Sequence, residues 1–75
     1  MDLKELKEVM GFKQWGVYLG GRPYVIVYDK TTKEYTASTK TRENKTIYIL
    51  DYGEGTQTIE EAKEAVLKYH KKVLS

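Results

Sequence analysis

Residues 15–28 read WGVYLGGRPYVIVY, and this stretch decides the fold. Two adjacent glycines separate runs rich in aromatic and β-branched residues, as a two-residue hairpin turn requires, because both central residues of such a turn take positive φ. With Gly20 and Gly21 in the turn, Trp15 faces Ile26, and directly opposed residues share one face of a sheet. One face of the predicted hairpin then carries Trp15, Val17, Tyr24, Ile26 and Tyr28, and the other carries Gly16, Tyr18, Pro23, Val25 and Val27.

A third strand is predicted in EYTASTK, residues 34–40, after a polar turn. A loop of even length places Tyr35 and Ala37 on the face of Trp15, whereas a five-residue loop would reverse every side chain. We favour the even register because it collects the large apolar groups on one side. The opposite face of this strand then carries Thr36, Ser38 and Lys40. A fourth strand is predicted in TIYIL, residues 46–50, with Ile47 and Ile49 toward the core.

Helical patterns occur at both ends of the sequence. Thr58 and Glu61 form a capping-box pattern before a long helix, whose apolar residues recur at helical spacing. These are Ile59, Ala62, Val66, Tyr69 and Val73. Near the N-terminus, Leu3, Leu6 and Met10 share a helical spacing, which predicts a short helix over about residues 3–10 that ends at Gly11.

The predicted order is a short N-terminal helix, a four-stranded antiparallel meander and a long C-terminal helix, which is an α+β fold. Packing both helices on one face of the sheet is the simplest way to bury their apolar stripes. The 75 residues make one domain, 1–75, with no room for a second core. A domain this small has a limited core, and without cysteine it gains stability from close packing or from a second copy, so a monomer and a homodimer both remain as alternatives.

Composition argues against several classes of protein. The net charge is only +2, from 13 basic and 11 acidic residues, whereas proteins that hold nucleic acid mainly by their field are usually more basic. No apolar run approaches the roughly 20 residues of a membrane span, and the charged segment MDLKELKEVM does not resemble a secretory signal. We therefore expect a cytoplasmic protein without a membrane partner.

Residues suited to catalysis are scarce in this sequence. His70 is the only histidine, and among the lysines of the last helical turn it is expected to be solvated and to complement the helix dipole. Asp51 and Glu54 in DYGEG are too few for a hard cation, which needs several oxygen ligands. The glycines of LGGRP join two strands, whereas a phosphate-binding loop opens a helix. We expect no enzyme, no cofactor and no metal site.

Two binding functions remain. The sheet face opposite the helices is low in charge, combines apolar and tyrosine side chains, and has no predicted layer over it, which is typical of surfaces that dock proteins. Its predicted contact residues are Tyr18, Val25, Val27, Thr36, Ser38 and Lys40. Unpaired edge strands offer a second mode, in which a partner strand or another copy extends the sheet. We therefore expect a small adaptor, inhibitor or regulator of the kind encoded by phages and mobile elements.

The alternative is a regulator that binds DNA or RNA through the sheet and the basic loops 30–33 and 40–45. Its candidate contacts are Lys30, Lys33, Lys40, Arg42 and Lys45. A small sheet backed by a helix resembles, in outline, the DNA-reading domains of some integrase N-termini and plant AP2-type factors, although none of their motifs stands in this sequence. Residues 30–33 and 42–45 flank one strand, so we expect these two basic groups at opposite ends of the sheet.

Overall fold

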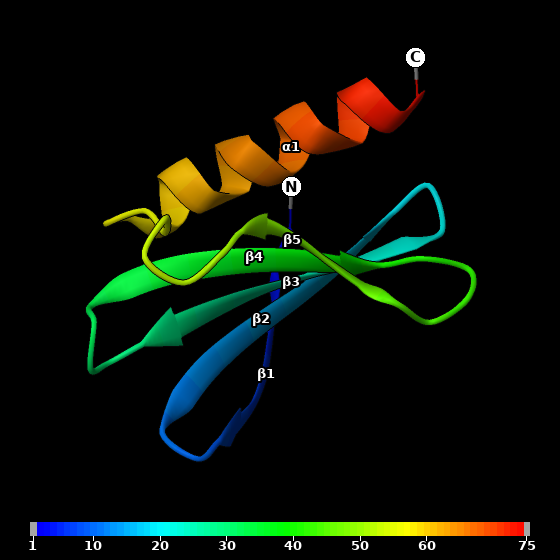
Figure 1. Cartoon of the computed structure of the whole chain (residues 1–75). Coiled ribbons are helices and arrows are strands. Elements are labelled where there is room, and N and C mark those ends of the chain that lie inside the picture. The colour runs from blue at the N-terminus through cyan, green and yellow to red at the C-terminus, as the bar shows by residue number, and fades with distance from the viewer. Residues whose placement is uncertain (1, 75) are drawn as a thin grey trace.

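The computed structural model describes residues 2–74, so Met1 and Ser75 of the predicted domain lie outside the described residues. The fold is α+β, with one antiparallel sheet in the order β1-β2-β3-β4-β5 and one C-terminal helix. Figure 1 shows the strands as a meander with the helix on one side. The elements are β1 (Lys4–Val9), β2 (Phe12–Leu19), β3 (Arg22–Asp29), β4 (Glu34–Lys40), β5 (Thr46–Leu50) and α1 (Ile59–Leu74).

The central hairpin forms as predicted. Gly20 and Gly21 take φ angles of 58° and 81°, the left-handed values that glycine adopts without steric cost. This turn sets the register in which Trp15 pairs with Ile26 across β2 and β3. The large apolar side chains of both strands therefore share one face.

The register of β4 is also the predicted even one, since Ala37 pairs with Ile26. A four-residue loop makes this connection, and Asp29 organises it through its side chain and its carbonyl. Its Oδ1 accepts a hydrogen bond from the Thr31 amide at 2.8 Å, and its carbonyl accepts one from the Lys33 amide at 2.8 Å. Turn chemistry and hydrophobic patterning therefore specify the same pairing.

The predicted N-terminal helix is wrong, because residues 4–9 form the edge strand β1, and the sheet has five strands instead of four. Met10 and Gly11 have φ angles of 52° and 81° and form a second two-residue turn. A helix of about two turns is marginal without packing, whereas a strand here satisfies the open edge of β2. The backbone pairing therefore overrides the helical spacing of the leucines.

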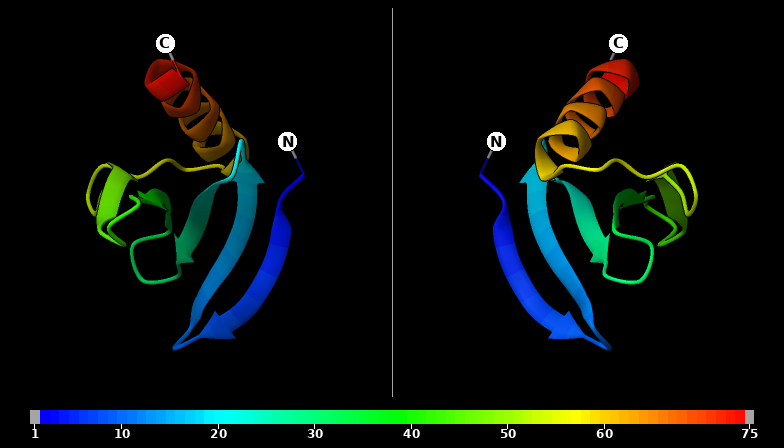
Figure 2. Two further views of the ribbon diagram at one scale, coloured as in Figure 1. Left: turned by 90° about the vertical axis from the view of Figure 1, so that its right-hand side faces the viewer. Right: turned by 90° about the vertical axis from the view of Figure 1, so that its left-hand side faces the viewer.

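The core lies between the sheet and α1, which packs against β3, β4 and β5. It is built from Tyr24 and Ile26 of β3, Ala37 of β4, and Ala62 and Val66 of α1. Four residues of the predicted stripe face the sheet, namely Ile59, Ala62, Val66 and Tyr69, whereas Val73 near the end of α1 is 40% exposed. Figure 2 shows that the sheet is strongly twisted, so that the β1–β2 hairpin extends away from the helix.

A bulge in β5 changes which of its side chains face the core. The pairing passes from Ala37–Leu50 to Ser38–Tyr48 and skips Ile49. As a result, Ile49 and Leu50 both pack against the core cluster, although they are adjacent along the strand.

The start of α1 is fixed by the predicted capping box. The Glu61 amide donates to Thr58 Oγ1 at 3.2 Å, and the Thr58 hydroxyl lies 2.9 Å from Glu61 Oε1. No helix within residues 2–74 has the length and apolar character needed to cross a bilayer.

Candidate binding surface

The face of the sheet opposite α1, called here the outer face, is continuous across all five strands. One row of paired residues crosses it from edge to edge: Lys4, Gly16, Val25, Ser38 and Tyr48. The outer face also includes the predicted residues Tyr18, Val27, Thr36 and Lys40. Val25 and Val27 therefore lie on the side away from α1, as the predicted register requires.

A groove runs over the outer face where β1, β2 and β3 meet. Its volume is about 530 Å³, and its lining includes Leu6, Gly16, Tyr18, Pro23 and Val25. We call these five residues the outer groove. The Leu6 side chain packs directly over Gly16, since a Cβ added at Gly16 would lie 3.1 Å from Leu6 Cδ1. Leu6 thus occupies the place that a side chain at Gly16 would need, which brings Leu6 of β1 onto this surface.

The predicted contact residues are not equally accessible. Tyr18 is 76% exposed, and Lys40 is also exposed, so both can reach a partner. Val25, Val27 and Ser38 are half-buried and present only part of their surface. Thr36, at 8% exposure, contributes almost no contact area although it lies on the predicted face.

Leu6 and Lys4 were not predicted as part of this surface, whereas Pro23 lies on the face predicted for it. Leu6 was assigned to a helix, and only the pairing of Lys4 with Gly16 brings β1 beside the outer face. The available signal was the pair Met10-Gly11, in which glycine occupies the second position of a possible hairpin turn before the β-rich run that starts at Phe12.

The candidate nucleic-acid contacts separate into two groups, as expected from their positions along the chain. Lys30 and Lys33 precede β4, and Lys30 forms an ion pair with Glu8 at 3.3 Å. Lys40, Arg42 and Lys45 lie at the other end of β4, where Lys45 Nζ is 3.5 Å from Glu43. The five residues therefore do not form one patch.

Arg22, which was not among the predicted contacts, joins the second group. It lines a smaller pocket of about 320 Å³ together with Lys40 and Arg42. The other lining residues are Gly20, Gly21, Pro23 and Thr41. We call this the basic pocket. In a meander, the turn between β2 and β3 and the loop between β4 and β5 lie at the same end of the sheet, which is why these residues meet.

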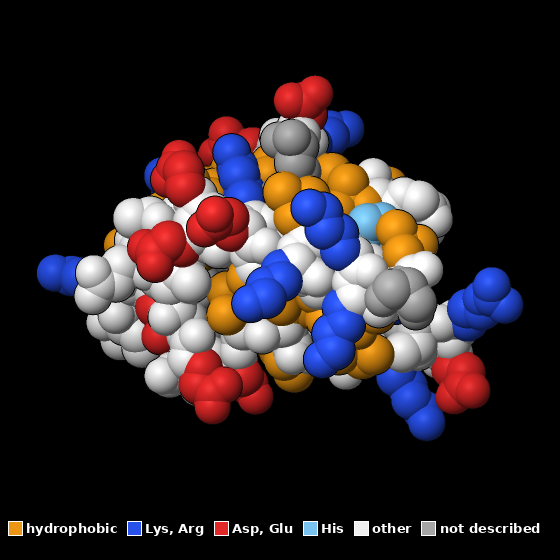
Figure 3. Space-filling view, turned by 90° about the horizontal axis from the view of Figure 1, so that it is seen from above, with side chains coloured by type: hydrophobic (Ala, Val, Ile, Leu, Met, Phe, Trp, Pro, Cys, Tyr) orange, Lys and Arg blue, Asp and Glu red, His pale blue; other side chains and the backbone are white. Residues whose placement is uncertain are grey.

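Charge is segregated along the molecule. Glu60 and Glu61 occupy the first turn of α1, and Lys71 and Lys72 occupy its last turn, which complements the helix dipole at both ends. On the helix side, Figure 3 shows acidic side chains gathered over the end where α1 begins, with Lys and Arg side chains beyond them. The small net charge of +2 is therefore the sum of acidic and basic side chains that lie toward different ends of α1.

The only histidine lies in a structural contact. His70 is half-buried rather than solvated, and its Nδ1 is hydrogen-bonded to the Tyr24 hydroxyl at 2.8 Å. The rings meet edge to face, with centroids 5.5 Å apart. Burial raises the pKa of Tyr24, and the nearby Arg22 charge partly opposes this effect. The hydrogen bond and the ring contact together hold the end of α1 against β3, with the phenol of Tyr24 in its neutral form.

The described residues contain no group of three or more His, Cys, Asp or Glu side chains able to hold a metal ion. Besides the outer groove and the basic pocket, the described surface has a hollow along α1 between Thr56 and Lys71. Comparison with models of protein families, with curated proteins and with solved structures finds no match for the chain.

Proposed function

We propose that this protein is a non-catalytic binding protein that docks a partner protein on its outer face. The observation that carries the proposal is the outer groove, an apolar hollow bordered by the exposed ring of Tyr18 on the side of the sheet that α1 leaves uncovered. Grooves lined by apolar and aromatic side chains are typical of sites where one anchor residue of a partner is buried.

The partner expected here is a protein segment that places one apolar side chain in the outer groove. Asp2 and Lys4 both line this groove, so one charge of each sign lies beside the apolar anchor site, and Lys40 on the same face favours an acidic residue of the partner further along the sheet. Addition of a partner strand to β1 is less favourable, because Lys4, Glu5, Lys7 and Glu8 place charges along that edge. Docking on the face is therefore the mode that we propose.

A matched pair of tyrosine variants tests this function. Tyr18→Ala removes the aromatic border of the outer groove, whereas Tyr52→Ala removes a similarly exposed ring, 61% accessible, from the loop before α1. In affinity purification from the native cell with nuclease added, we expect Tyr18→Ala to lose the partner and Tyr52→Ala to keep it. Retention of the same partner by Tyr18→Ala would show that the outer groove is not the docking site.

Filling the outer groove provides a second test, in which Tyr18 is kept and the exposed Leu6 side chain shifts to make room, since a Cβ at Gly16 would lie 3.1 Å from Leu6 Cδ1. Gly16→Val places a side chain in the floor of the groove at a position whose φ is not in the left-handed region. Since valine favours strands, we expect the fold to persist while the partner is lost. Circular dichroism and the same purification measure these two outcomes.

Nucleic-acid binding is the second candidate, and it is favoured by the meeting of Arg22, Lys40 and Arg42 at one end of the sheet. It predicts retention on heparin at low salt and an affinity for duplex or single strands that falls steeply as salt rises. If the protein is not retained on heparin at low salt, nucleic-acid binding is excluded. Capture of a partner that disappears on nuclease treatment would favour it over the protein partner.

A further inference from the structure

The basic pocket contains both arginines of the protein. The sequence has two arginines and eleven lysines, and Arg22 and Arg42 are separated by twenty positions. Folding brings them to the same small pocket, one from the start of β3 and one from the loop after β4. A guanidinium group presents its N–H donors as a planar fork that matches an oxyanion, whereas a lysine supplies only a point charge.

The charges of the pocket are not balanced by carboxylates. Arg22, Lys40 and Arg42 contribute three positive charges, and none of the seven lining residues is acidic. Glu43, the nearest carboxylate in sequence, pairs with Lys45 instead. Across residues 2–74, neither arginine takes part in an ion pair with a carboxylate. Like charges held together in this way favour a bound anion.

Hydrogen bonds hold the loop that carries Arg42. The Thr41 amide donates to the Lys45 carbonyl at 2.9 Å, and the Lys45 amide donates to Thr41 Oγ1 at 3.1 Å. The Asn44 amide donates to the Thr41 carbonyl at 2.9 Å. Because these bonds close the loop on itself, the backbone that carries the exposed Arg42 side chain is held in place before any ligand arrives, which lowers the entropic cost of ordering the loop on binding.

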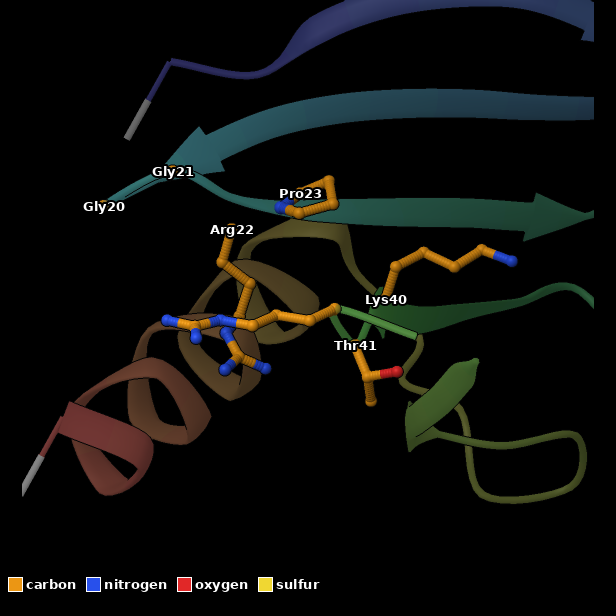
Figure 4. A pocket seen from close by; sticks show the side chains of 7 residues that line it. Gly20, Gly21, Arg22, Pro23, Lys40 and Thr41 are labelled. Carbon is orange, nitrogen blue, oxygen red and sulfur yellow. The ribbon is translucent and has the colours of Figure 1, made fainter. Parts of the chain in front are cut away.

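Figure 4 shows how the labelled residues lie around the pocket. The Arg22 side chain projects away from the start of β3, while Lys40 extends in a different direction, away from Arg22. Gly20 and Gly21 border the pocket with backbone only, and a Cβ at Gly21 would meet no atom within 4 Å. The direct contacts to an anion would therefore come from the arginines, with Lys40 adding to the field.

We infer that the basic pocket binds a terminal phosphate group of a small molecule. One guanidinium fork already satisfies the two oxygens of a carboxylate, whereas a terminal phosphate has three oxygens and close to two negative charges at neutral pH. Two arginines therefore match a phosphate better than a carboxylate. This inference stands apart from the proposed docking of a protein, because it depends on a different set of side chains.

Titration followed by NMR tests the inference. Inorganic phosphate and a nucleoside monophosphate are added separately, at constant ionic strength, to protein labelled with ¹⁵N, and the arginine Nε–H and backbone amide signals are recorded. We expect saturable shifts at Arg22, Arg42, Gly20 and Gly21 with phosphate, and weaker shifts with acetate. A response to the monophosphate alone would assign the site to nucleotides, and a response to both would assign it to phosphate groups in general.

Variants separate binding from folding. Arg22→Gln and Arg42→Gln are each expected to weaken phosphate binding about tenfold or more, as expected for loss of hydrogen bonds to a charged group. Lys33→Gln, at the opposite end of β4, should leave the affinity unchanged. The dispersion of the amide spectrum reports whether each variant is folded. Phosphate affinity measured on either folded arginine variant is sufficient to test the inference.

Three results would overturn the inference. The first is an equal response to phosphate and acetate, and the second is unchanged phosphate binding in both arginine variants. The third is arginine-dependent binding of duplex DNA without saturable shifts from either phosphate probe, which would assign the arginines to the nucleic-acid backbone.

Discussion

At Gly55 the connection into α1 passes so close to β4 that a side chain does not fit. A Cβ there would lie 2.5 Å from the Tyr35 carbonyl oxygen and 3.0 Å from Glu34 Cβ. The next residue, Thr56, exchanges two backbone hydrogen bonds with Tyr35, at 2.7 and 2.9 Å. Because Gly55 has no side chain, the connection can lie against β4, and Thr56 pairs with Tyr35 at a position of β4 that β5 does not reach.

We therefore expect Gly55→Ala to lower the free energy of unfolding by about 1–3 kcal/mol, as overpacking commonly does. Gly16→Ala is the matched control, because its nearest neighbour is the movable Leu6 side chain rather than the backbone. Urea denaturation of both variants measures the difference. Equal stability of the two would mean that the chain at Gly55 can move away from β4 without cost.

The burial of Tyr24 makes the stability of the fold depend on pH in the alkaline range. Burial raises the pKa of Tyr24 above 10.0 in the folded protein, so the neutral phenol is favoured by folding. This contribution is fully present below pH 10 and is lost as the pH rises through the folded pKa. Urea midpoints should therefore fall above about pH 10. In Tyr24→Phe the fall should be smaller, and an equal fall would assign the effect to other residues.

Among the elements, β1 is the one that local sequence patterns misassign. Leu3 and Leu6 have helical spacing, but in the extended chain they separate, with Leu3 packed toward the core cluster and Leu6 over Gly16 on the outer face. Pairing with β2 is a contact made through the backbone, and apolar spacing does not report it. By contrast, the turn at Gly20 and Gly21 and the cap at Thr58 are local, and both were predicted.

The candidate site also divides into features that follow from local sequence patterns and features that depend on contacts between elements. Alternation along β3 and β4 was sufficient to place Val25 and Ser38 on the outer face. The outer groove was not predictable in this way, because it needs Leu6 from another element over Gly16. The meeting of Arg22 with Arg42 could have been found, because a meander brings alternate turns to the same end of the sheet. The predicted four-strand order already contained that information.

The turn between β1 and β2 permits a stabilising substitution. Met10 has φ of 52° and is 91% exposed, so it adopts a left-handed conformation without packing that compensates for it. Asparagine tolerates this conformation, and Asn-Gly is the preferred pair for such a turn. We expect Met10→Asn to raise the free energy of unfolding by about 0.5–1 kcal/mol in urea denaturation. A lower free energy of unfolding in Met10→Asn would contradict the left-handed conformation of Met10 and favour a helical N-terminus.

For the whole molecule, the distribution of burial predicts two levels of stability. All five core residues belong to β3, β4 and α1, whereas every residue of β1 is exposed. Regions with few buried apolar contacts open locally at low free energy, while a core strand exchanges its amide hydrogens only through global unfolding. The outer groove therefore joins a stable part, β3, to a part that opens more readily, β1.

Hydrogen exchange measured by NMR should show this division directly. We expect amides in the interior of β3 and β4 to be the slowest, and those of β1 to exchange by local opening at least tenfold faster. Occupation of the outer groove by its partner should slow exchange in β1, because Leu6 and Lys4 line that groove and would be held in place. The connection at residues 51–58 does not line the groove and should not respond. Exchange in β1 as slow as in β3 before any partner is added would contradict the two levels, and the edge strand would then be part of the cooperative core.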